Sequence, residues 1–424
     1  MSPHEYINDH AKDLLALLRR LVELPTINPP GEYYDVITRM LVAELAEAGL
    51  VVRRPRVPKK LLQQHLPCAQ WDRPRWNVLG RLAARRTGGA KAAPKPAAAK
   101  TLHFNAHYDV VPVSGEWRHG SPFSGRVEAG WIYGRGTADM KGSIASLVMA
   151  LRALRATGTA AAVNVEVSFT ADEETDSALG AGWVVEHGGV KPDYAIVMEG
   201  GEGRRIGCGH NGVVWLEVTV RGRAAHGSTP ERGVNAFEHA ARLALALQEH
   251  GRELAARSFT APNGEKSYPT LNVGGMFSSG EGGKINTVPA LARFSVDRRV
   301  IPSERVQEAE QELRNFIAAT ARGLSGAQVE VAKVSDNHPC FVPPDHALAR
   351  ALAAQVAKER RCRPEFGCSK GFNDMHFFAN KLGVPTLGYG PGGDHCHAVD
   401  ERAAVKELLA SARIYAGLIS GGVS

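Results

Sequence analysis

A repeated pattern of short apolar strands that end in polar clusters constrains the fold of this chain most strongly. Such segments lie at Thr101–Asn105, Val163–Thr170, Tyr194–Met198 and Thr386–Tyr389. A segment with helical spacing, Ser143–Thr157, precedes the second of them. Strands that alternate with helices predict an α/β domain with a central, mostly parallel sheet flanked by helices. Ligands of such sheets bind beyond the carboxyl ends of the strands, and the polar clusters fall there.

The middle of the chain follows a different pattern. Between residues 212 and 334, strand-like and helix-like segments follow the order β-α-β-β-α-β, at residues 213–220, 234–249, 270–276, 292–300, 303–322 and 328–334. This order is typical of a ferredoxin-like unit. A chain of 424 residues also exceeds what one hydrophobic core usually organises. We therefore expect an α/β domain formed by residues 1–211 and 335–424, interrupted by an inserted α+β domain of residues 212–334.

Composition excludes several classes of protein. The formal net charge is +7, but the arginines are spread along the chain and form no basic tract with interleaved aromatic residues. The apolar runs are too short to span a bilayer, and the N-terminal residues are not those of a signal peptide. The 6 cysteines include no CxxC pair, which fits reduced thiols. We expect a cytoplasmic protein that binds neither nucleic acid nor a membrane, with a low-complexity exposed or disordered loop at Arg85–Lys100.

Side chains that bind divalent metals recur at strand ends and in glycine-framed turns. They are His107, Asp109, Asp139, Glu173, Glu174, Glu199 and His397. Each alone is more often an ordinary surface or turn residue, but imidazole and carboxylate groups together accept zinc, manganese and cobalt. Asp109 lies two residues after His107, on the same side of an extended chain. Its carboxylate can therefore accept the second imidazole N–H and orient the ring.

Several long motifs occur in register along almost the whole chain. They are HYDVVP, GRGTADMKG, ADEE, HAVDE and the pattern G-x-x-AH-x-x-x-P-x-x-G-x-NA. With them the sequence resembles the family of acetylornithine deacetylase, succinyl-diaminopimelate desuccinylase and aminoacylase, which are dinuclear metallohydrolases. The resemblance implies a zinc-exopeptidase-like α/β fold whose inserted ferredoxin-like domain serves as a lid and in dimerisation.

The resemblance also implies roles for the metal-binding side chains. His107, Asp139 and Glu199 would hold one metal, and Asp139, Glu174 and His397 the other, so that Asp139 bridges the two. Glu173 would be the general base. The spacing of the two glutamates alone leaves the reverse assignment open, with Glu173 as ligand and Glu174 as base.

Further residues match positions that bind substrate in the family. His226, in RGRAAHGSTP, matches a histidine that stabilises the developing oxyanion, often in the active site of the partner subunit. Asn286 and Arg299 match residues that hold polar groups of the substrate, and we expect Arg298 to face the solvent. Gly371, Phe372 and Asn373, in the segment Gly371–Asp374, match a glycine-rich substrate loop. The family usually has a small hydroxyl residue in this loop, and Phe372 and Asn373 depart from that.

Other candidate side chains have a plainer interpretation. We expect His395 and Glu202 to be loop residues, Cys208 and His210 to be packing or hinge residues, and His376 to have a core or surface role or to line the pocket.

Three functions compete at this point. The first is hydrolysis of a C–N bond in a small carboxylate-bearing substrate, most simply an N-acyl amino acid. The second is release of ammonia from an aromatic amine, because the family includes an aminohydrolase of nitroanthranilate; Phe372, His376 and Phe377 would then form an aromatic wall. The third is an inactive metal-binding scaffold, which has no need of Glu173. We expect a homodimer that holds one or two zinc, manganese or cobalt ions per subunit.

Overall fold

The computed structural model describes residues 1–84, 99–200, 203–280 and 283–423. Most of the predicted loop at Arg85–Lys100 lies outside these residues. Glu202, which we expected to be a loop residue, also lies outside them. The chain forms two compact units. The α/β unit consists of Met1–Cys208, Val342–Gly367 and Asn373–Ser424, and the inserted unit of Gly209–Phe341 and Cys368–Phe372.

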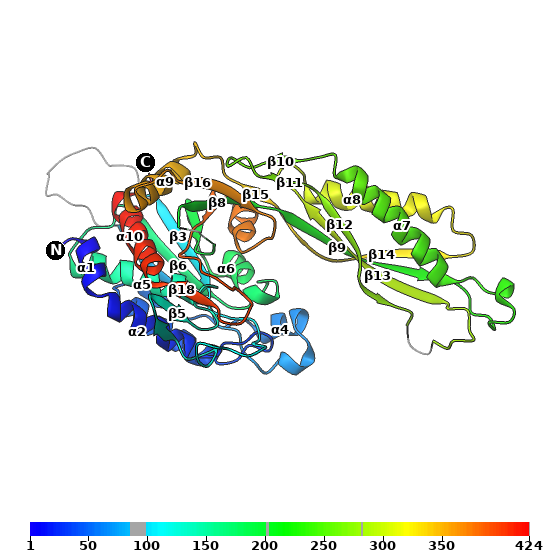
Figure 1. Ribbon diagram of the computed structural model, residues 1–424, viewed down its shortest axis with the longest axis horizontal. Helices are drawn as coiled ribbons and strands as arrows, with labels where there is room; N and C mark the ends of the chain where they lie inside the picture. Colours follow the sequence, from blue (N-terminus) through cyan, green and yellow to red (C-terminus); the bar gives the residue numbers. More distant parts are fainter. Residues whose placement is uncertain (85–98, 201–202, 281–282, 424) are drawn as a thin grey trace. The chain divides into compact units, whose positions relative to one another are not determined.

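The α/β unit is built on a mixed sheet (Figure 1). The strands of this sheet are β1 (Val51–Arg53), β2 (Val78–Leu82), β3 (Thr101–His107), β6 (Asn164–Thr170), β7 (Tyr194–Val197), β8 (Arg205–His210), β16 (Glu365–Ser369) and β17 (Thr386–Gly388). They follow the order β1-β2-β6-β3-β7-β17-β8, and β16 pairs with β8. The neighbours β6, β3, β7 and β17 are parallel, as the sequence predicts. β1 runs antiparallel to β2, β2 to β6 and β8 to β17, and β15 (Cys340–Phe341) pairs with β8 at the end of the order.

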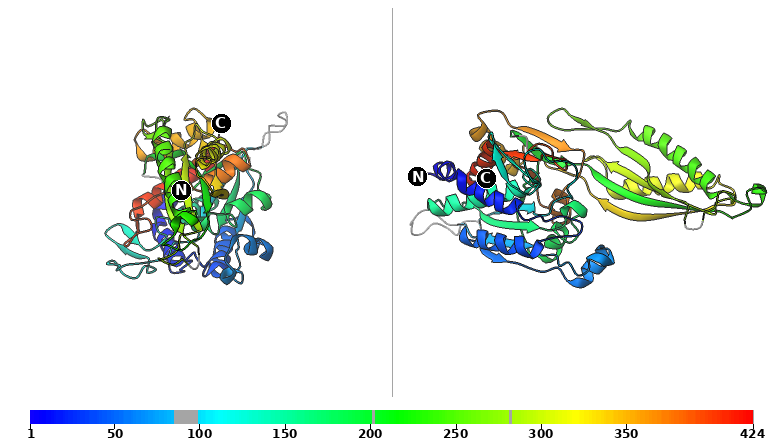
Figure 2. Two further views of the ribbon diagram at one scale, coloured as in Figure 1. Left: turned by 90° about the vertical axis from the view of Figure 1, so that its right-hand side faces the viewer. Right: turned by 60° about the horizontal axis from the view of Figure 1, so that its bottom comes forward.

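Helices surround this sheet, and a short second sheet lies in the same unit. The helices are α1 (Pro3–Asp9), α2 (Ala11–Val22), α3 (Tyr34–Glu47), α4 (Lys59–His65), α5 (Lys141–Ala156), α6 (Ala181–His187), α9 (Ala347–Arg360) and α10 (Val405–Gly421). Single turns lie at Cys68–Gln70, Glu173–Thr175 and Phe377–Lys381. The second sheet has β4 (Arg126–Glu128), β5 (Trp131–Tyr133) and β18 (Arg402–Ala404). α1, α5 and α10 pack side by side, which Figures 1 and 2 also show.

The two faces of strand β3 differ in polarity, and His107, its last residue, lies on the polar face. Phe104 points towards α10, where its ring lies 5.6 Å from that of Tyr415. On the other face, the ring of His103 lies 4.9 Å from that of Phe378. Side chains alternate along a strand, so His107 shares the face of His103 and closes the strand at its carboxyl end. The sheet therefore places His107 where parallel sheets bind ligands.

The inserted unit has the predicted β-α-β-β-α-β succession. Its main elements are β9 (Gly212–Arg221), α7 (Ala236–Leu254), β12 (Thr270–Ser278), β13 (Leu291–Val300), α8 (Val306–Ala321) and β14 (Gln328–Asn337). Smaller elements are β10 (Phe259–Thr260), β11 (Lys266–Ser267), β15 (Cys340–Phe341) and a turn at Pro230–Arg232. The antiparallel sheet has the order β12-β13-β9-β14, which is the ferredoxin-like arrangement.

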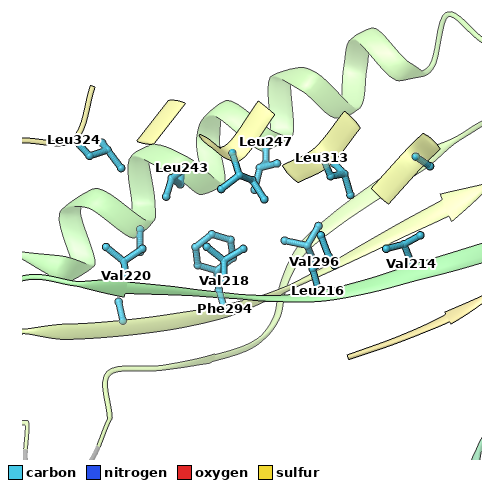
Figure 3. Close-up of a cluster of buried hydrophobic side chains, with 14 of the residues drawn as sticks. Val214, Leu216, Val218, Val220, Leu243, Leu247, Phe294, Val296, Leu313 and Leu324 are labelled. Carbon is cyan, nitrogen blue, oxygen red and sulfur yellow. The ribbon is translucent and has the colours of Figure 1, made fainter. Parts of the chain in front are cut away.

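The core of the inserted unit lies between this sheet and its two helices, which cover the same face (Figures 2 and 3). Every second residue of β9, from Val214 to Val220, is buried there. Leu243 and Leu247 of α7 and Leu313 of α8 fill the space above the strands. Each buried aliphatic side chain of this kind contributes about 1.5–3 kcal/mol relative to exposure. The remaining side chains of β9 and β13 point to the opposite face of the sheet, because side chains alternate along a strand.

No helix in the described ranges is both long enough and apolar enough to cross a membrane.

Candidate functional site

The predicted metal-binding side chains of the α/β unit lie at the carboxyl ends of neighbouring parallel strands. His107 is the last residue of β3, Glu173 begins the turn that follows β6, and Glu199 follows β7. Asp139 precedes α5, and His397 lies in the loop before β18. Strand ends and loops that are far apart in the sequence thus supply one site.

Asp139 lies between two imidazole rings. Its Oδ1 atom is 3.0 Å from Nε2 of His107, and its Oδ2 atom is 3.2 Å from Nε2 of His397. His397 Nε2 is also 3.2 Å from Oε2 of Glu174. His107, Asp139 and Glu174 each offer one ligand atom, and these atoms lie within 4.8 Å of one another. The two oxygens of Asp139 therefore face different partners, which is the arrangement that a bridging carboxylate needs.

The site contains more buried negative charge than its imidazoles offset. Burial raises the pKa of Glu199 to about 8, and the neighbouring charge of Asp139 adds to this effect. Burial also raises the pKa of Glu174, although a hydrogen bond with His397 opposes the change. Hydrogen bonds with Asp139 and then Glu174 raise the pKa of His397 to about 10. The carboxylates thus favour a bound proton or another cation at this place.

Unpaired oxygen atoms indicate which cation fits. Oε1 of Glu174 and Oε2 of Glu199 are buried and, in the described part of the chain, have no hydrogen-bond partner. Buried acceptors normally have a partner, and a divalent metal would supply one for both. The donor set of imidazole nitrogens and carboxylate oxygens therefore fits a divalent-metal centre.

Glu173 lies next to this group but outside it. Its Oε2 atom is 4.0 Å from Nε2 of His107, and 16% of its side chain is exposed. Burial, followed by the charge of Glu199, raises the pKa of Glu173 well above its usual value. The structure thus places Glu174 among the candidate ligand atoms and leaves the Glu173 carboxylate beside them.

Asp109 makes further contacts beside the one that we expected with His107. The acceptor closest to Nδ1 of His107 is the backbone carbonyl oxygen of Asp109, at 3.1 Å, and the Asp109 carboxylate is 3.5 Å away. That carboxylate accepts the backbone N–H of Glu173 at Oδ1 and of Glu174 at Oδ2, both at 3.2 Å. Asp109 therefore contacts His107 through both its main chain and its carboxylate, and the same carboxylate holds the turn that carries both glutamates.

Two buried acidic residues near the site were given no role of their own in the sequence analysis. Glu401 accepts backbone N–H groups of Gly136, Ala138 and Asp139, and so fixes the loop that presents Asp139. Asp374 accepts a hydrogen bond from Ser177 Oγ, and its charge raises the pKa values of Glu173 and Glu199. Glu401 is the last residue of the HAVDE motif, which is the only sequence signal for it.

In the inserted unit, His226 and Asn286 lie on adjacent loops. The chain segments pair at His226 and Thr287, and the Gly227 N–H donates to the Asn286 carbonyl oxygen at 2.7 Å. His226 is exposed, and its Nδ1 atom accepts the backbone N–H of Ser228 at 3.2 Å. In the neutral ring the proton is then on Nε2, so the outer edge of His226 is a hydrogen-bond donor.

The expectation that Arg298 faces the solvent was wrong. Arg298 is fully buried and pairs with Glu304 at 2.8 Å, because it continues the inward-facing set of Phe294 and Val296 on β13. Arg299 therefore points to the face of the sheet without helices. Its guanidinium carbon lies 5.8 Å from the ring centre of Phe372.

The remaining predicted residues have mostly local contacts. Gly371 is exposed, and its N–H donates to Ser369 Oγ at 3.1 Å. The Asn373 side-chain oxygen accepts the Met375 N–H at 3.1 Å, so it stabilises its own turn. Phe377 is buried, and a Cβ on Gly182 of α6 would lie 2.9 Å from its ring, which does not fit an aromatic wall open to substrate.

Within the described residues, the candidate side chains for which we expected a plainer role lie outside the group of candidate ligand atoms. Cys208 and His210 are buried, which fits packing, and burial lowers the pKa of His210 to about 4. His376 is buried with its ring centre 4.0 Å from that of Phe377. His395 is exposed and is not part of the group of candidate ligand atoms.

Solved structures share this fold. A tripeptidase from Staphylococcus aureus aligns with a TM-score of 0.74 at 18% identity, over 97% of this chain and 98% of its own. A peptidase of the M20 family from Bacillus subtilis, described as binding a dinuclear metal, aligns with a TM-score of 0.67 at 16% identity, over 98% of this chain and 99% of its own.

Sequence comparisons show the family. A succinyl-diaminopimelate desuccinylase of Methylocella silvestris is 31% identical over 340 residues, or 76% of this chain and 82% of the relative. A succinyl-diaminopimelate desuccinylase of Methylorubrum extorquens is 28% identical over 419 residues, or 96% of this chain and 98% of the relative. Residues 103–421 match the profile of peptidase family M20/M25/M40. The chain belongs to this family and is a metal-dependent hydrolase that acts on carbon–nitrogen bonds.

Proposed function

We propose that the protein hydrolyses the amide bond of an N-acyl amino acid or a similar small carboxylate-bearing substrate, with Glu173 as general base. The observation that carries the proposal is the position of Glu173, whose carboxylate lies beside the candidate ligand atoms without belonging to their group. The two relatives are named succinyl-diaminopimelate desuccinylases, and these names support an N-acyl substrate.

Two metal sites sharing Asp139 fit the donor atoms of the α/β unit. His107, Asp139 and Glu199 would hold one divalent ion, and Asp139, Glu174 and His397 the other. The relative described as binding a dinuclear metal supports this number. Zinc, manganese and cobalt all accept such ligands. When bound, the ions supply Lewis acidity, which polarises the amide carbonyl group and makes water a stronger nucleophile at neutral pH.

Proton transfer falls to Glu173. It takes a proton from the attacking water and delivers it to the leaving nitrogen, which leaves as an amine. Asp109 contributes by holding the backbone of the turn on which Glu173 lies.

Residues of the inserted unit would recognise the substrate. His226 presents an N–H at its outer edge, which suits a negative charge that develops on the carbonyl oxygen. Asn286, whose main chain pairs with that of Gly227 beside His226, would contact polar groups of the same ligand. Arg299 offers a planar guanidinium group to the carboxylate of the substrate.

An apolar groove on the inserted unit supports a homodimer. The groove, of about 920 Å³, runs between α7 and the edge strand β12. Phe237, Leu245 and Phe277 line it and are 63%, 64% and 83% exposed. An unpaired strand edge beside exposed apolar side chains is typical of an association surface, and a second copy of this chain offers a matching edge and apolar face. We propose that the two copies meet here and that His226 acts in the active site of the partner subunit.

One observation favours the aromatic-amine alternative. The ring centre of Phe372 lies 5.8 Å from the guanidinium carbon of Arg299 and 6.2 Å from the ring centre of Trp215. Two aromatic rings beside a carboxylate-binding guanidinium group suit a planar ring carboxylate such as nitroanthranilate. Release of ammonia from such a ring remains the second candidate function.

A substrate screen with metal-loaded protein separates the two candidates. We expect N-succinyl and N-acetyl amino acids to release free amino acid, measured with an amine-reactive dye. Ammonia, measured enzymatically in the same samples, is expected to stay at the background level with nitroanthranilate and other aromatic amines. Ammonia release from the aromatic amines without deacylation would overturn the proposal and establish the alternative.

A further inference from the structure

The turn that carries Glu173 has an unusual backbone. Asp172, Asp176 and Ser177 have φ angles of 59°, 94° and 55°, in the left-handed region that residues with a Cβ rarely adopt. Strained backbone of this kind persists only where surrounding contacts hold it, and it is common at active sites. The contacts that hold this turn therefore show how Glu173 is kept in place.

A buried ion pair holds the first residue of the turn. Arg75 Nε donates to Oδ2 of Asp172 at 2.7 Å, and the two side chains are only 0% and 3% exposed. The other nitrogens of Arg75 donate to the Arg73 carbonyl oxygen at 3.0 Å and to Gln70 Oε1 at 3.1 Å. A Cβ on Gly31 would lie 2.6 Å from Nη1 of Arg75, and Gly31 has a φ of 91°, so the loop is shaped around the guanidinium group.

Asn28 joins both ends of the turn. Its side-chain nitrogen is 3.1 Å from Oδ1 of Asp172, 2.9 Å from Oγ1 of Thr175 and 3.0 Å from Oδ2 of Asp109. The Asp109 carboxylate in turn accepts the backbone N–H groups of Glu173 and Glu174. Every residue from Asp172 to Thr175 is thus tied, directly or through Asp109, to Asn28.

We propose that Asn28, Arg75 and Asp172, together called the turn clamp, are positioning residues for the general base. The clamp fixes the direction of the Glu173 carboxylate relative to the ligands, and no member of the clamp has to touch the substrate. A buried ion pair contributes little net stability compared with well-packed apolar side chains. We therefore assign the clamp the role of fixing the conformation of the turn. The proposal rests on Glu173 being the general base.

The test compares Arg75→Met with a matched variant in the same unit. Arg75→Met keeps the length of the side chain and removes its charge and its hydrogen bonds. The control is Arg413→Met, because Arg413 also pairs with a glutamate, Glu359, at 2.6 Å and both side chains are mostly buried. We expect Arg75→Met to lower kcat by about 10–100-fold, the scale of a misplaced catalytic group, with KM and metal content unchanged. Arg413→Met is expected to change only the unfolding temperature.

A double variant shows whether the clamp acts through Glu173. In a Glu173→Ala background, Arg75→Met is expected to cause no further loss of kcat, because the group that it positions is absent. Loss of the same factor in both backgrounds would overturn the proposal. An unchanged kcat in Arg75→Met, with a fall in unfolding temperature like that of Arg413→Met, would also overturn it and leave the clamp a purely structural role.

A second variant, Asn28→Ser, tests the same proposal if the Arg75→Met protein does not fold. Asn28→Ser removes the amide group that reaches Asp109, Asp172 and Thr175 and keeps a polar side chain. We expect a lower kcat with unchanged KM and metal content, and an unchanged kcat contradicts the proposal. If Glu173→Ala itself retains full activity, the proposed function fails first, and the two failures are thereby distinguished.

Discussion

Replacing Glu173 with alanine is expected to lower kcat by about 10²–10⁴-fold, the usual contribution of a general base, while the protein keeps its metal. The reason is that the Glu173 carboxylate is not among the candidate ligand atoms formed by His107, Asp139 and Glu174. The measurement is steady-state kinetics on the best N-acyl substrate together with metal content by elemental analysis. Full activity in Glu173→Ala would show that the base lies elsewhere.

The contrasting variant is Asp139→Ala, in which metal and activity are both expected to be lost. Asp139 faces His107 with one oxygen and His397 with the other, so its removal deprives both proposed metal sites of a ligand. Elemental analysis of the two variants, prepared in the same way, separates the roles. Equal metal retention in Glu173→Ala and Asp139→Ala contradicts the assignment of base and bridge.

A mixture of two inactive chains is expected to regain activity. Glu173→Ala lacks the proposed base, and His226→Ala lacks the proposed oxyanion donor. If His226 acts across a dimer, one site of the mixed dimer contains both an intact Glu173 and an intact His226, and a random mixture recovers a substantial fraction of wild-type activity. Subunit exchange is verified by native mass spectrometry of differently tagged chains. A verified mixed dimer without recovered activity removes His226 from its proposed role in the partner's site.

The apolar groove supplies the control for this experiment. Leu245→Glu places a charge among the exposed apolar side chains between α7 and β12, where a second copy would bury it. In this background we expect monomers by light scattering and no recovery on mixing. Dimers that persist in Leu245→Glu would place the interface on another surface.

The secondary structure of this chain could be predicted where buried apolar residues recur at a regular spacing along the sequence. Strand β9 alternates from Val214 to Val220 because one face of its sheet is covered by helices and the other is not. The same alternation on β13 carries Ala292, Phe294 and Val296 inward, and extended by one step it places Arg298 inward as well. The position of Arg298 thus follows from the alternation along β13, although arginine side chains are mostly exposed in proteins.

The contacts that hold the site could not be predicted from local patterns. Arg135 Nη1 donates a hydrogen bond to Oε2 of Glu401 at 2.6 Å, although the two residues are 266 positions apart in the sequence. Asn28 and Asp172, which also form a hydrogen bond, are 144 positions apart. Hydrogen bonds between distant segments follow no period, so only the folded chain brings these partners together. Strands β1 and β8 escaped prediction for other reasons: β1 has only three residues, and two of the six residues of β8 are glycines, which are depleted in strands.

The most direct test of the account is the activity of the protein as metal is removed and returned. Protein treated with a chelator and shown to be metal-free by elemental analysis is titrated with zinc, manganese or cobalt, and hydrolysis of the best N-acyl amino acid is measured at each step. We expect no measurable turnover in the metal-free protein and recovery of activity as His107, Asp139, Glu174, Glu199 and His397 bind the added ions. Full activity in the verified metal-free protein would contradict this expectation.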